Sequence, residues 1–316
     1  MSTPSSAPRP FRRQEFDFWS FFFSGLTGLS TLFILLILAV ILGNIFYHGW
    51  EGLSWNFVTS GTERDMFDLE SAGVLPMIVG TSARVILMTI LVVPVGVITA
   101  IYLTEYARSG SLATRFIRGA INNLAGVPSI VFGLFGLGFF IAFVGVGMDR
   151  ILGYESAHWG KPALLWAAAT LAVMTLPVVI VATEESLRAI APGLREASLS
   201  MGATKLQTVA HIVLPQALPG ILTGAILAIS RAAGEVAPIL FTGAAYYMAT
   251  MPKSLSDQFM DLGYHVFVLS TQSPNIDQTR PLLYATVLVL LLLTFALNFV
   301  AILLRARLRR KLRAAH

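Results

Sequence analysis

Six long apolar stretches, separated by short polar segments, dominate the chain. They cover residues 25–46, 74–103, 121–145, 162–182, 217–241 and 282–304. A helix needs about 20 apolar residues to cross the roughly 30 Å hydrocarbon core of a membrane, and each stretch is long enough. The pattern predicts an all-α, polytopic membrane protein with six transmembrane helices. The first stretch is longer than a signal-peptide core and lacks a cleavage site before Tyr47, so we expect a retained anchor.

Composition supports a membrane protein and excludes several other classes. The 316 residues are 55% hydrophobic and only 12% charged, which is more apolar than a soluble core needs. The net charge of +5 does not indicate nucleic-acid binding, because the basic residues lie between or beyond the apolar stretches. The chain has no cysteine, and its five histidines are scattered without the spacing of metal ligands. We expect no metal site, no cofactor-binding residue and no catalytic residue.

The distribution of Lys and Arg predicts the orientation of the chain. Of 22 such residues, fifteen lie in the N-terminal tail, in the segments after the second and fourth stretches, and in the C-terminal tail. Five lie in the alternate segments, and Arg84 and Arg231 lie within the stretches themselves. By the positive-inside rule, both termini are expected to be cytoplasmic.

The segment after the fourth stretch reads as a helix, a turn and a second helix. Pro192 suits a first helical turn, and Gly202 suits the end of that helix because glycine adopts the left-handed conformation without strain. Thr204 and Gln207 form a capping box that begins the second helix. Two capped ends predict a rigid elbow, which transmits force better than a flexible loop.

The residues of this elbow resemble the EAA loop of ABC importer permeases. The match consists of Glu196-Ala197-Ser198, Gly202, Ile212 and Leu214-Pro215, with Ser198 in place of the second Ala. Ser198 is small, so we expect close approach to a partner to survive. The resemblance implies a type I ABC importer permease fold, with these seven residues docking on a cytoplasmic ATPase.

Arg231 and Glu235 lie inside the fifth apolar stretch. Each costs about 2.5–3.5 kcal/mol at the centre of a membrane helix, so neither is expected to face lipid. Their i, i+4 spacing is expected to place both on one helical face and allows an ion pair, which is one complete explanation for both. The alternative is an anion path, because Gly234 and Pro238 weaken the helix beside them. A separate row of small residues favours close helix packing; it comprises Gly220, Gly224, Ala228 and Ala232.

The stretch Ser230-Arg231-Ala232-Ala233-Gly234-Glu235-Val236-Ala237-Pro238 resembles the signature of the PstA family of phosphate-importer permeases, with Val236 in place of Thr. The resemblance extends through 101–106, 127–134 and 255–274, and it covers most of the chain after about Val74. It implies that Arg231 and Glu235 line the path of inorganic phosphate.

The resemblance also implies partners and a location. These partners are a second permease subunit (PstC-like), two ATPase subunits (PstB-like) that bind ATP and Mg, and a phosphate-binding protein (PstS-like). The location is the bacterial cytoplasmic (inner) membrane. We expect a cytoplasmic tail over 1–24, a first helix and outer loop over 25–73, a permease domain over 74–304 with its coupling loop at 183–215, and a basic cytoplasmic tail over 305–316.

Other functions remain open. The chain has no Gly-x-Ser-x-Gly, His-Glu-x-x-His or Walker A motif, so we expect no enzyme and an external source of energy. An importer of another oxyanion, such as sulfate or molybdate, fits the same architecture. A channel subunit or membrane scaffold would explain the helices but not the elbow. Arg84 is expected near the outer interface, where it snorkels toward water or attracts anions.

Overall fold

The computed structural model describes residues 18–61, 67, 72–108, 110–248 and 250–314. Six helices or helical runs in these ranges are long and apolar enough to cross a membrane, which confirms the predicted number of spans. The described residues are helical apart from connecting segments and one isolated bridge between Ala244 and Phe259. Most of the predicted N-terminal tail, residues 1–17, lies outside the described residues.

Helix α1 (Phe18–Trp50) begins before the predicted 25–46 stretch. Aromatic side chains extend its first turns, because Trp19 packs edge-on against Phe22 and stacks on Phe23. The part of α1 up to Tyr47 belongs to the first of two compact units. Its side chains are almost all exposed within this chain, as expected for a helix whose apolar surface faces lipid or another protein.

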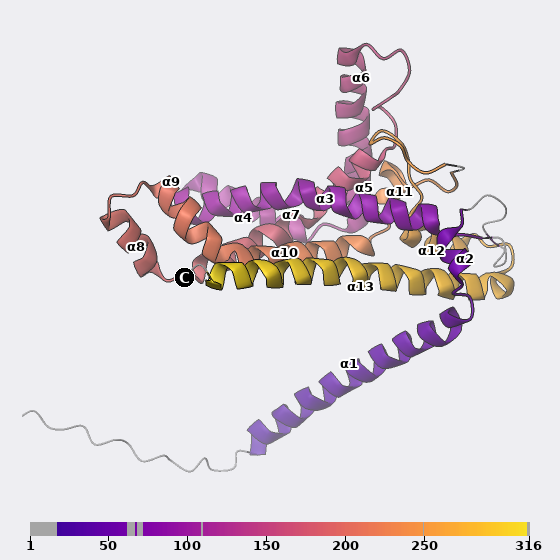
Figure 1. The fold of residues 1–316 in the computed structure, drawn as a ribbon, viewed down its shortest axis with the longest axis horizontal. Helices are drawn as coiled ribbons and strands as arrows, with labels where there is room; N and C mark the ends of the chain where they lie inside the picture. Colours follow the sequence, from indigo (N-terminus) through magenta and orange to yellow (C-terminus); the bar gives the residue numbers. More distant parts are fainter. Residues whose placement is uncertain (1–17, 62–66, 68–71, 109, 249, 315–316) are drawn as a thin grey trace, which may run out of the picture. The chain divides into compact units, whose positions relative to one another are not determined.

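The second unit is built around four long helices, α3 (Leu75–Ile101), α7 (Leu164–Arg188), α10 (Leu214–Ala233) and α13 (Ile276–Ala314). Figure 1 shows them running side by side, with α7 packed on α3 and α10, and α10 packed on α13. The shorter elements are α2 (Trp55–Thr59), α8 (Pro192–Ser200), α9 (Lys205–Thr208), α11 (Ile239–Thr242), α12 (Leu262–Thr271) and two π-helical segments, η1 (Tyr102–Tyr106) and η3 (Val209–Val213).

Small residues let these helices approach closely. A Cβ atom added at Gly224 would lie 2.7 Å from the Cβ of Ala182, and one added at Gly96 would lie 2.7 Å from Val179. A Cβ at Gly220 would overlap the hydroxyl of Ser186. The row of small residues on α10 therefore faces α7, as the close-packing interpretation predicted.

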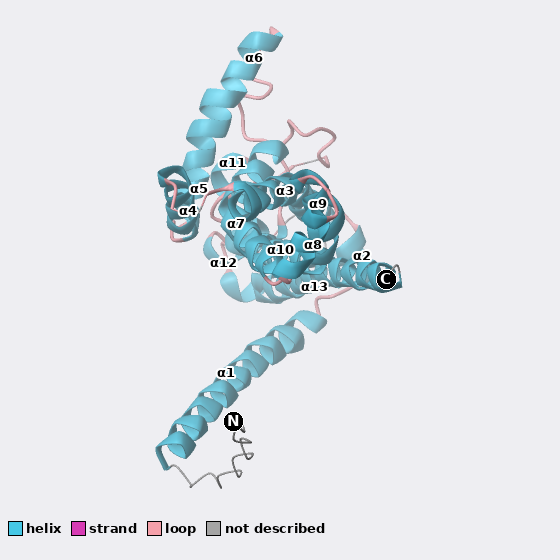
Figure 2. Ribbon diagram, turned by 90° about the vertical axis from the view of Figure 1, so that its left-hand side faces the viewer, coloured by secondary structure: helices cyan, strands magenta, loops and turns pink. Residues whose placement is uncertain are grey.

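The third predicted span is not one helix over 121–145. Residues 121–125 belong to the end of α4 (Leu112–Ala125), and the membrane-spanning run is a separate rod over Ser129–Leu152. This rod is made of α5 (Ser129–Phe135), η2 (Gly136–Gly145) and α6 (Val146–Leu152), and it turns away from the four long helices (Figures 1 and 2). The break falls at Gly126-Val127-Pro128, because proline has no N–H to donate and disfavours helical backbone in the residue before it.

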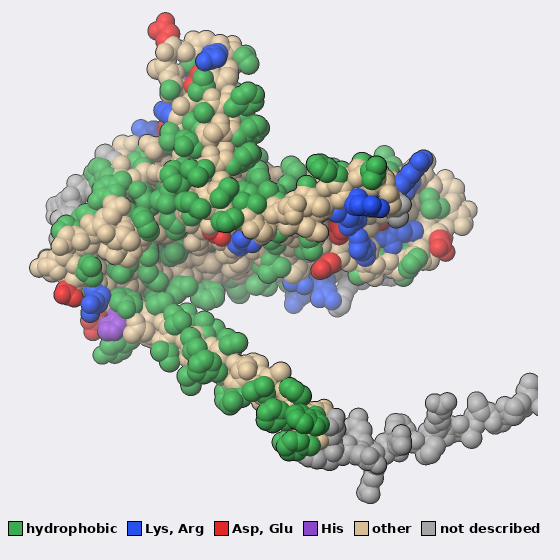
Figure 3. All heavy atoms as spheres, turned by 180° about the vertical axis from the view of Figure 1, so that it is seen from behind, with side chains coloured by type: hydrophobic (Ala, Val, Ile, Leu, Met, Phe, Trp, Pro, Cys, Tyr) green, Lys and Arg blue, Asp and Glu red, His purple; other side chains and the backbone are tan. Residues whose placement is uncertain are grey.

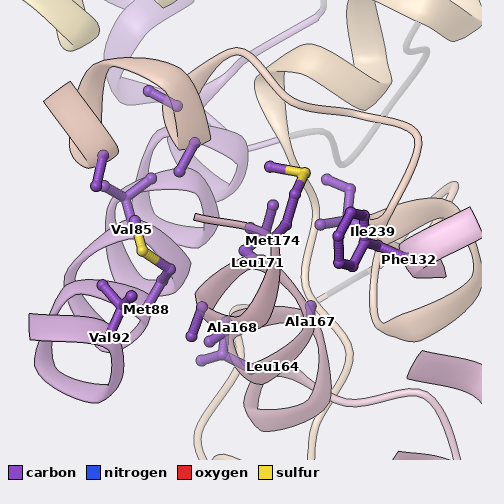
Figure 4. Packing of buried hydrophobic residues seen from close by; sticks show 14 of the residues in the cluster. Val85, Met88, Val92, Phe132, Leu164, Ala167, Ala168, Leu171, Met174 and Ile239 are labelled. Carbon is purple, nitrogen blue, oxygen red and sulfur yellow. The ribbon is translucent and has the colours of Figure 1, made fainter. Parts of the chain in front are cut away.

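The main apolar core joins α3, α5, α7 and α11. Figure 4 shows Met88, Leu171 and Met174 among the buried side chains of this cluster, with Phe132 and Ile239 packed beside them. Each of these five is at most 4% exposed. The core fixes the start of α5 and α11 against α7, and so fixes the end of α10 that precedes α11.

Candidate functional site

The predicted elbow is present at one end of the four long helices. Helix α8 begins with Pro192 in its first turn, and α9 begins with a capping box in which Gln207 N–H donates to the Thr204 hydroxyl at 3.3 Å. The Gln207 side chain accepts in return from the Thr204 N–H at 2.8 Å. Helices α9 and α10 are joined through η3, so the helical run Lys205–Ala233 is continuous over 29 residues. We call this end of the second unit the elbow end.

Gly202 ends α8 with a left-handed backbone, φ +86°. The N–H of Gly202 donates to the carbonyl of Leu199 at 3.0 Å, and the N–H of Ala203 donates to Ser198 at 3.3 Å. These two bonds form a Schellman motif, which turns the chain sharply and satisfies the last carbonyls of the helix. The predicted role of Gly202 as a helix terminator is confirmed.

The seven predicted docking residues fall into two groups. Glu196, Ala197 and Gly202 are exposed on α8 and its turn. Ile212 in η3 and Leu214-Pro215 at the start of α10 are half-buried, where they join the elbow to the long helix. Ser198 lies between the groups, because its hydroxyl lies 2.9 Å from that of Thr208 on α9. The serine that departs from the EAA pattern therefore links the two arms of the elbow.

The elbow is anchored by an ion pair that the sequence pattern did not indicate. Arg195 on α8 donates to Glu105 on η1 from Nη2 at 2.9 Å and from Nε at 3.1 Å. The same guanidinium donates to the carbonyls of Leu187 and Ile190 at 2.7 and 2.9 Å. Four bonds from one planar group hold α8 in a fixed orientation relative to α7 and α3–η1.

A second group of candidate residues, which are charged, lies where α10 ends. The helix stops at Ala233, and the chain continues without helical structure until α11 begins at Ile239. The predicted weakening by Gly234 and Pro238 is thus a complete break. Glu235 lies beyond the helix, so the expectation that it shares a helical face with Arg231 is wrong, because that face ends before it.

The Arg231–Glu235 pair is nevertheless present. Arg231 Nε lies 3.6 Å from Glu235 Oε1, which is too long for a good hydrogen bond. The Arg231 side chain is 45% exposed and that of Glu235 is 22% exposed. The guanidinium therefore keeps donors available to another group, in a helix whose neighbouring Ala232 and Ala233 are buried.

The interpretation of Arg84 as a snorkelling residue is wrong. Arg84 is fully buried, and its Nε lies 2.6 Å from Oδ2 of Asp261, which is equally buried. Its Nη1 and Nη2 donate to the carbonyls of Ala232 and Ala233 at 2.8 and 3.1 Å. Burial is tolerated because each of the three guanidinium nitrogens has a partner, and the last turn of α10 gains donors that its carbonyls lack.

We call the buried ion pair and its bonds to α10 the Arg84–Asp261 clamp, and Asp261 binds further groups on the other side of it. Its Oδ2 accepts from the hydroxyl of Thr81 at 2.8 Å, and its Oδ1 accepts from the N–H of Tyr264 at 3.2 Å, which caps the start of α12. Thr81 in turn accepts from the N–H of Leu262 at 3.0 Å. One buried network therefore ties α3, the end of α10 and the start of α12 together.

Two segments quoted for the family resemblance meet at the same break. A Cβ atom added at Gly133 on α5 would lie 3.0 Å from the carbonyl of Ala237, and one added at Gly263 on α12 would lie 2.9 Å from Val236. The residue that replaces Thr in the signature, Val236, therefore packs against α12. The hydroxyl of Ser230 donates to Asn298 on α13 at 2.8 Å and completes the attachment of the end of α10.

Six apolar spans, a capped elbow at one end and a charged helix break define a polytopic membrane permease subunit. The chain belongs to the binding-protein-dependent transport system inner membrane component family, whose model matches residues 92–314.

Two relatives are similar to the chain in sequence, and one solved structure is similar to it in fold. The chain is 31% identical to the probable ABC transporter permease protein YqgI of Bacillus subtilis, over 79% of this chain and 82% of the relative. It is 34% identical to the phosphate transport system permease protein PstA of Yersinia pestis, over 74% and 70%. The bacterial alginate ABC transporter in complex with its periplasmic protein has a chain of the same fold, with a TM-score of 0.60, 12% identity and coverage of 93% and 97%.

Proposed function

We propose that this ABC importer permease carries inorganic phosphate and forms half of the transmembrane pathway with a second, similar permease. The half-exposed Arg231 at the break after α10 is the observation that carries the proposal. Several relatives named as phosphate permeases, including that of Yersinia pestis, support the choice of substrate.

The geometry of the Arg231–Glu235 pair suits an anion that must bind and then leave. A guanidinium matches the oxygens of phosphate with paired donors. Since the ion pair is 3.6 Å long, phosphate can take the free donors without displacing Glu235 completely. The carboxylate holds Arg231 near the path and weakens phosphate binding by like-charge repulsion, so that the anion is released.

The same proposal assigns the elbow to a cytoplasmic ATPase. Exposed apolar side chains lie beside Glu196 on α8 and its turn; Leu194 and Leu199 are exposed, and Met201 is 88% exposed. Two ATPase subunits would bind ATP and Mg, and a phosphate-binding protein would deliver the anion at the opposite end. ATP binding would close the ATPase pair, move the elbow and open the path outward, and hydrolysis would return it inward.

Phosphate uptake by the complex, reconstituted with its partner subunits, tests the substrate assignment. Arg231→Gln is expected to reduce uptake at least tenfold at normal expression, because it removes the charge that stabilises the anion. Arg280→Gln is the matched control, since Arg280 is an exposed arginine paired with Asp277 at 3.1 Å outside the break. Undiminished uptake by the Arg231 variant would sink the assignment.

A second measurement separates phosphate from another oxyanion. The ATPase activity of the wild-type complex is expected to rise with phosphate-loaded binding protein and not with sulfate-loaded or molybdate-loaded protein. Stimulation only by sulfate-loaded or molybdate-loaded protein would leave the assignment as an importer intact and would contradict phosphate as the substrate.

Copurification tests the docking assignment. Met201→Glu places a charge on the apolar tip of the elbow, so the ATPase is expected to be lost from the purified complex. Trp55→Glu is the control, because Trp55 is 82% exposed on α2, away from the elbow. Unaltered ATPase recovery with Met201→Glu would contradict docking at this tip.

A further inference from the structure

A cavity of about 450 Å³ lies at the elbow end, where η1, the start of α4 and the end of α7 meet. Its polar lining consists mainly of Ser111, Thr114, Arg115, Arg118 and Arg188. None of these residues belongs to the helix break or to the exposed side of α8. The cavity is therefore separate from both sites used by the proposed function.

The cavity carries more positive charge than its neighbours neutralise. Arg118 Nη1 and Arg188 Nη2 share one oxygen of Glu184, at 2.8 and 3.3 Å. Arg118 also donates to the carbonyl of Leu103 at 3.2 Å, and the side chain of Arg115 has no hydrogen bond or ion pair with the described residues. Three guanidinium groups therefore line the cavity, and the carboxylate of Glu184 pairs with two of them.

This surplus charge predicts an anion with several acceptor oxygens. Arginine forks bind phosphate oxygens in pairs, and the hydroxyls of Ser111 and Thr114 add donors on the same wall. The cavity volume of about 450 Å³ far exceeds the roughly 30 Å³ that one water occupies in the liquid. A free phosphate ion would fill only part of that space, so the size favours a phosphate that carries a substituent.

The neighbouring face of α4 indicates what that substituent is. Leu112 and Phe116, one helical turn apart, are 79% and 78% exposed. Figure 3 shows Lys and Arg side chains gathered at the elbow end, beside a largely apolar surface. A basic pocket bordered by exposed apolar side chains suits an anionic lipid, because the pocket can bind the headgroup and the apolar side chains can contact the acyl chains.

We propose that this cavity binds a phosphate-bearing anion, and that the phosphate belongs to an anionic phospholipid whose chains lie on Leu112 and Phe116. The phosphate is held between Arg115 and the Arg118–Arg188 pair. Leu103 on the cavity wall and Glu105, which anchors α8, belong to the same π-helical segment, so a bound lipid braces the support of the elbow.

Binding to the purified full-length protein in a neutral detergent tests the proposal. The titrants are short-chain phosphatidylglycerol, phosphatidylcholine of the same chain length, and inorganic phosphate. Phosphatidylglycerol is expected to bind, and Arg115→Gln and Arg188→Gln are each expected to weaken it about tenfold, since each removes a charge-assisted bond. Phosphatidylcholine, whose headgroup has no net charge, is expected to bind far more weakly.

The matched control is Arg108→Gln, because Arg108 is an exposed arginine in the same segment that does not line the cavity. It is expected to leave phosphatidylglycerol binding unchanged. Equal weakening by Arg108→Gln and Arg115→Gln would overturn the site and indicate a diffuse surface charge. Binding of inorganic phosphate that depends on Arg115, without binding of phosphatidylglycerol, would overturn the lipid assignment.

Discussion

The buried Arg84–Asp261 clamp makes a quantitative prediction about the stability of the break after α10. Arg84→Met keeps much of the volume of the arginine stem but removes the guanidinium. Asp261 then stays buried, with only the Thr81 hydroxyl and the Tyr264 N–H as partners. The carbonyls of Ala232 and Ala233 lose donors at 2.8 and 3.1 Å.

The magnitude follows from what is left unpaired. Removing one partner of a buried ion pair costs about 3–5 kcal/mol, because the other charge remains desolvated. A helix-end carbonyl that loses its donor adds about 1 kcal/mol, and relaxation of the chain offsets part of it. We expect Arg84→Met to lower the free energy of unfolding by about 4 kcal/mol, a large fraction of a typical 5–15 kcal/mol.

The double variant Arg84→Met/Asp261→Asn distinguishes charge from packing. Asparagine removes the buried charge and still accepts the N–H that caps α12. We therefore expect the double variant to be about 2 kcal/mol more stable than Arg84→Met alone. Unfolding by sodium dodecyl sulfate in mixed micelles, followed by circular dichroism, measures both differences.

A control variant and two outcomes decide the test. Arg280→Met breaks the exposed pair with Asp277 and is expected to have almost no effect on stability. Wild-type stability of Arg84→Met would refute the clamp. A double variant no more stable than Arg84→Met would refute the argument that an unpaired buried carboxylate causes the loss.

Three further variants probe other parts of the second unit. Gly202→Ala forces a Cβ into φ +86° and is expected to cost about 1 kcal/mol and weaken ATPase copurification, whereas Gly193→Ala in α8 is expected to lower neither, because alanine favours a helix over glycine. Glu105→Gln removes the charge facing Arg195 and is expected to increase hydrogen exchange of α8 more than that of α10. Burial lowers the pKa of His265, on α12 outside the six spans, to about 4, so the unfolded chain binds the extra proton below about pH 6.5. Stability is then lost as pH falls from 6.5 toward 4, by up to about 3 kcal/mol, and His265→Phe is expected to abolish this pH dependence in unfolding titrations.

The sequence could predict the local features of this fold. Hydropathy locates the spans because each membrane-crossing helix needs about 20 consecutive apolar residues, which is a local property of the sequence. The capping box at Thr204 and the left-handed turn at Gly202 were predictable because their hydrogen bonds join residues close in the chain. Proline at 128 accounts for the break in the third span, but the new direction of α5 depends on Gly133 packing against Ala237.

The long-range charges could not be predicted in the same way. Arg84 looked interfacial because the apolar pattern gives only depth, whereas its partner Asp261 is 177 residues away in sequence. Glu105 and Arg195 are 90 residues apart, and nothing in the spacing of either segment links them. Such pairs depend on the packing of α3 beside α7 and α10, which is a property of the folded chain.

These two missed pairs lie on one continuous helical run, and that placement bears on the proposed coupling. Helix α3 carries Arg84 and continues through η1 to Glu105, about 30 Å further along at 1.5 Å per residue. At one end Glu105 pairs with Arg195 on α8, and at the other Arg84 donates to the carbonyls of the last turn of α10, beside Arg231. The run Lys205–Ala233 connects the same two places through the elbow. Since α3–η1 and the run Lys205–Ala233 are joined at both ends, we expect them to move together. Displacement of α8 would then reach the carbonyls next to Arg231 through both helical runs.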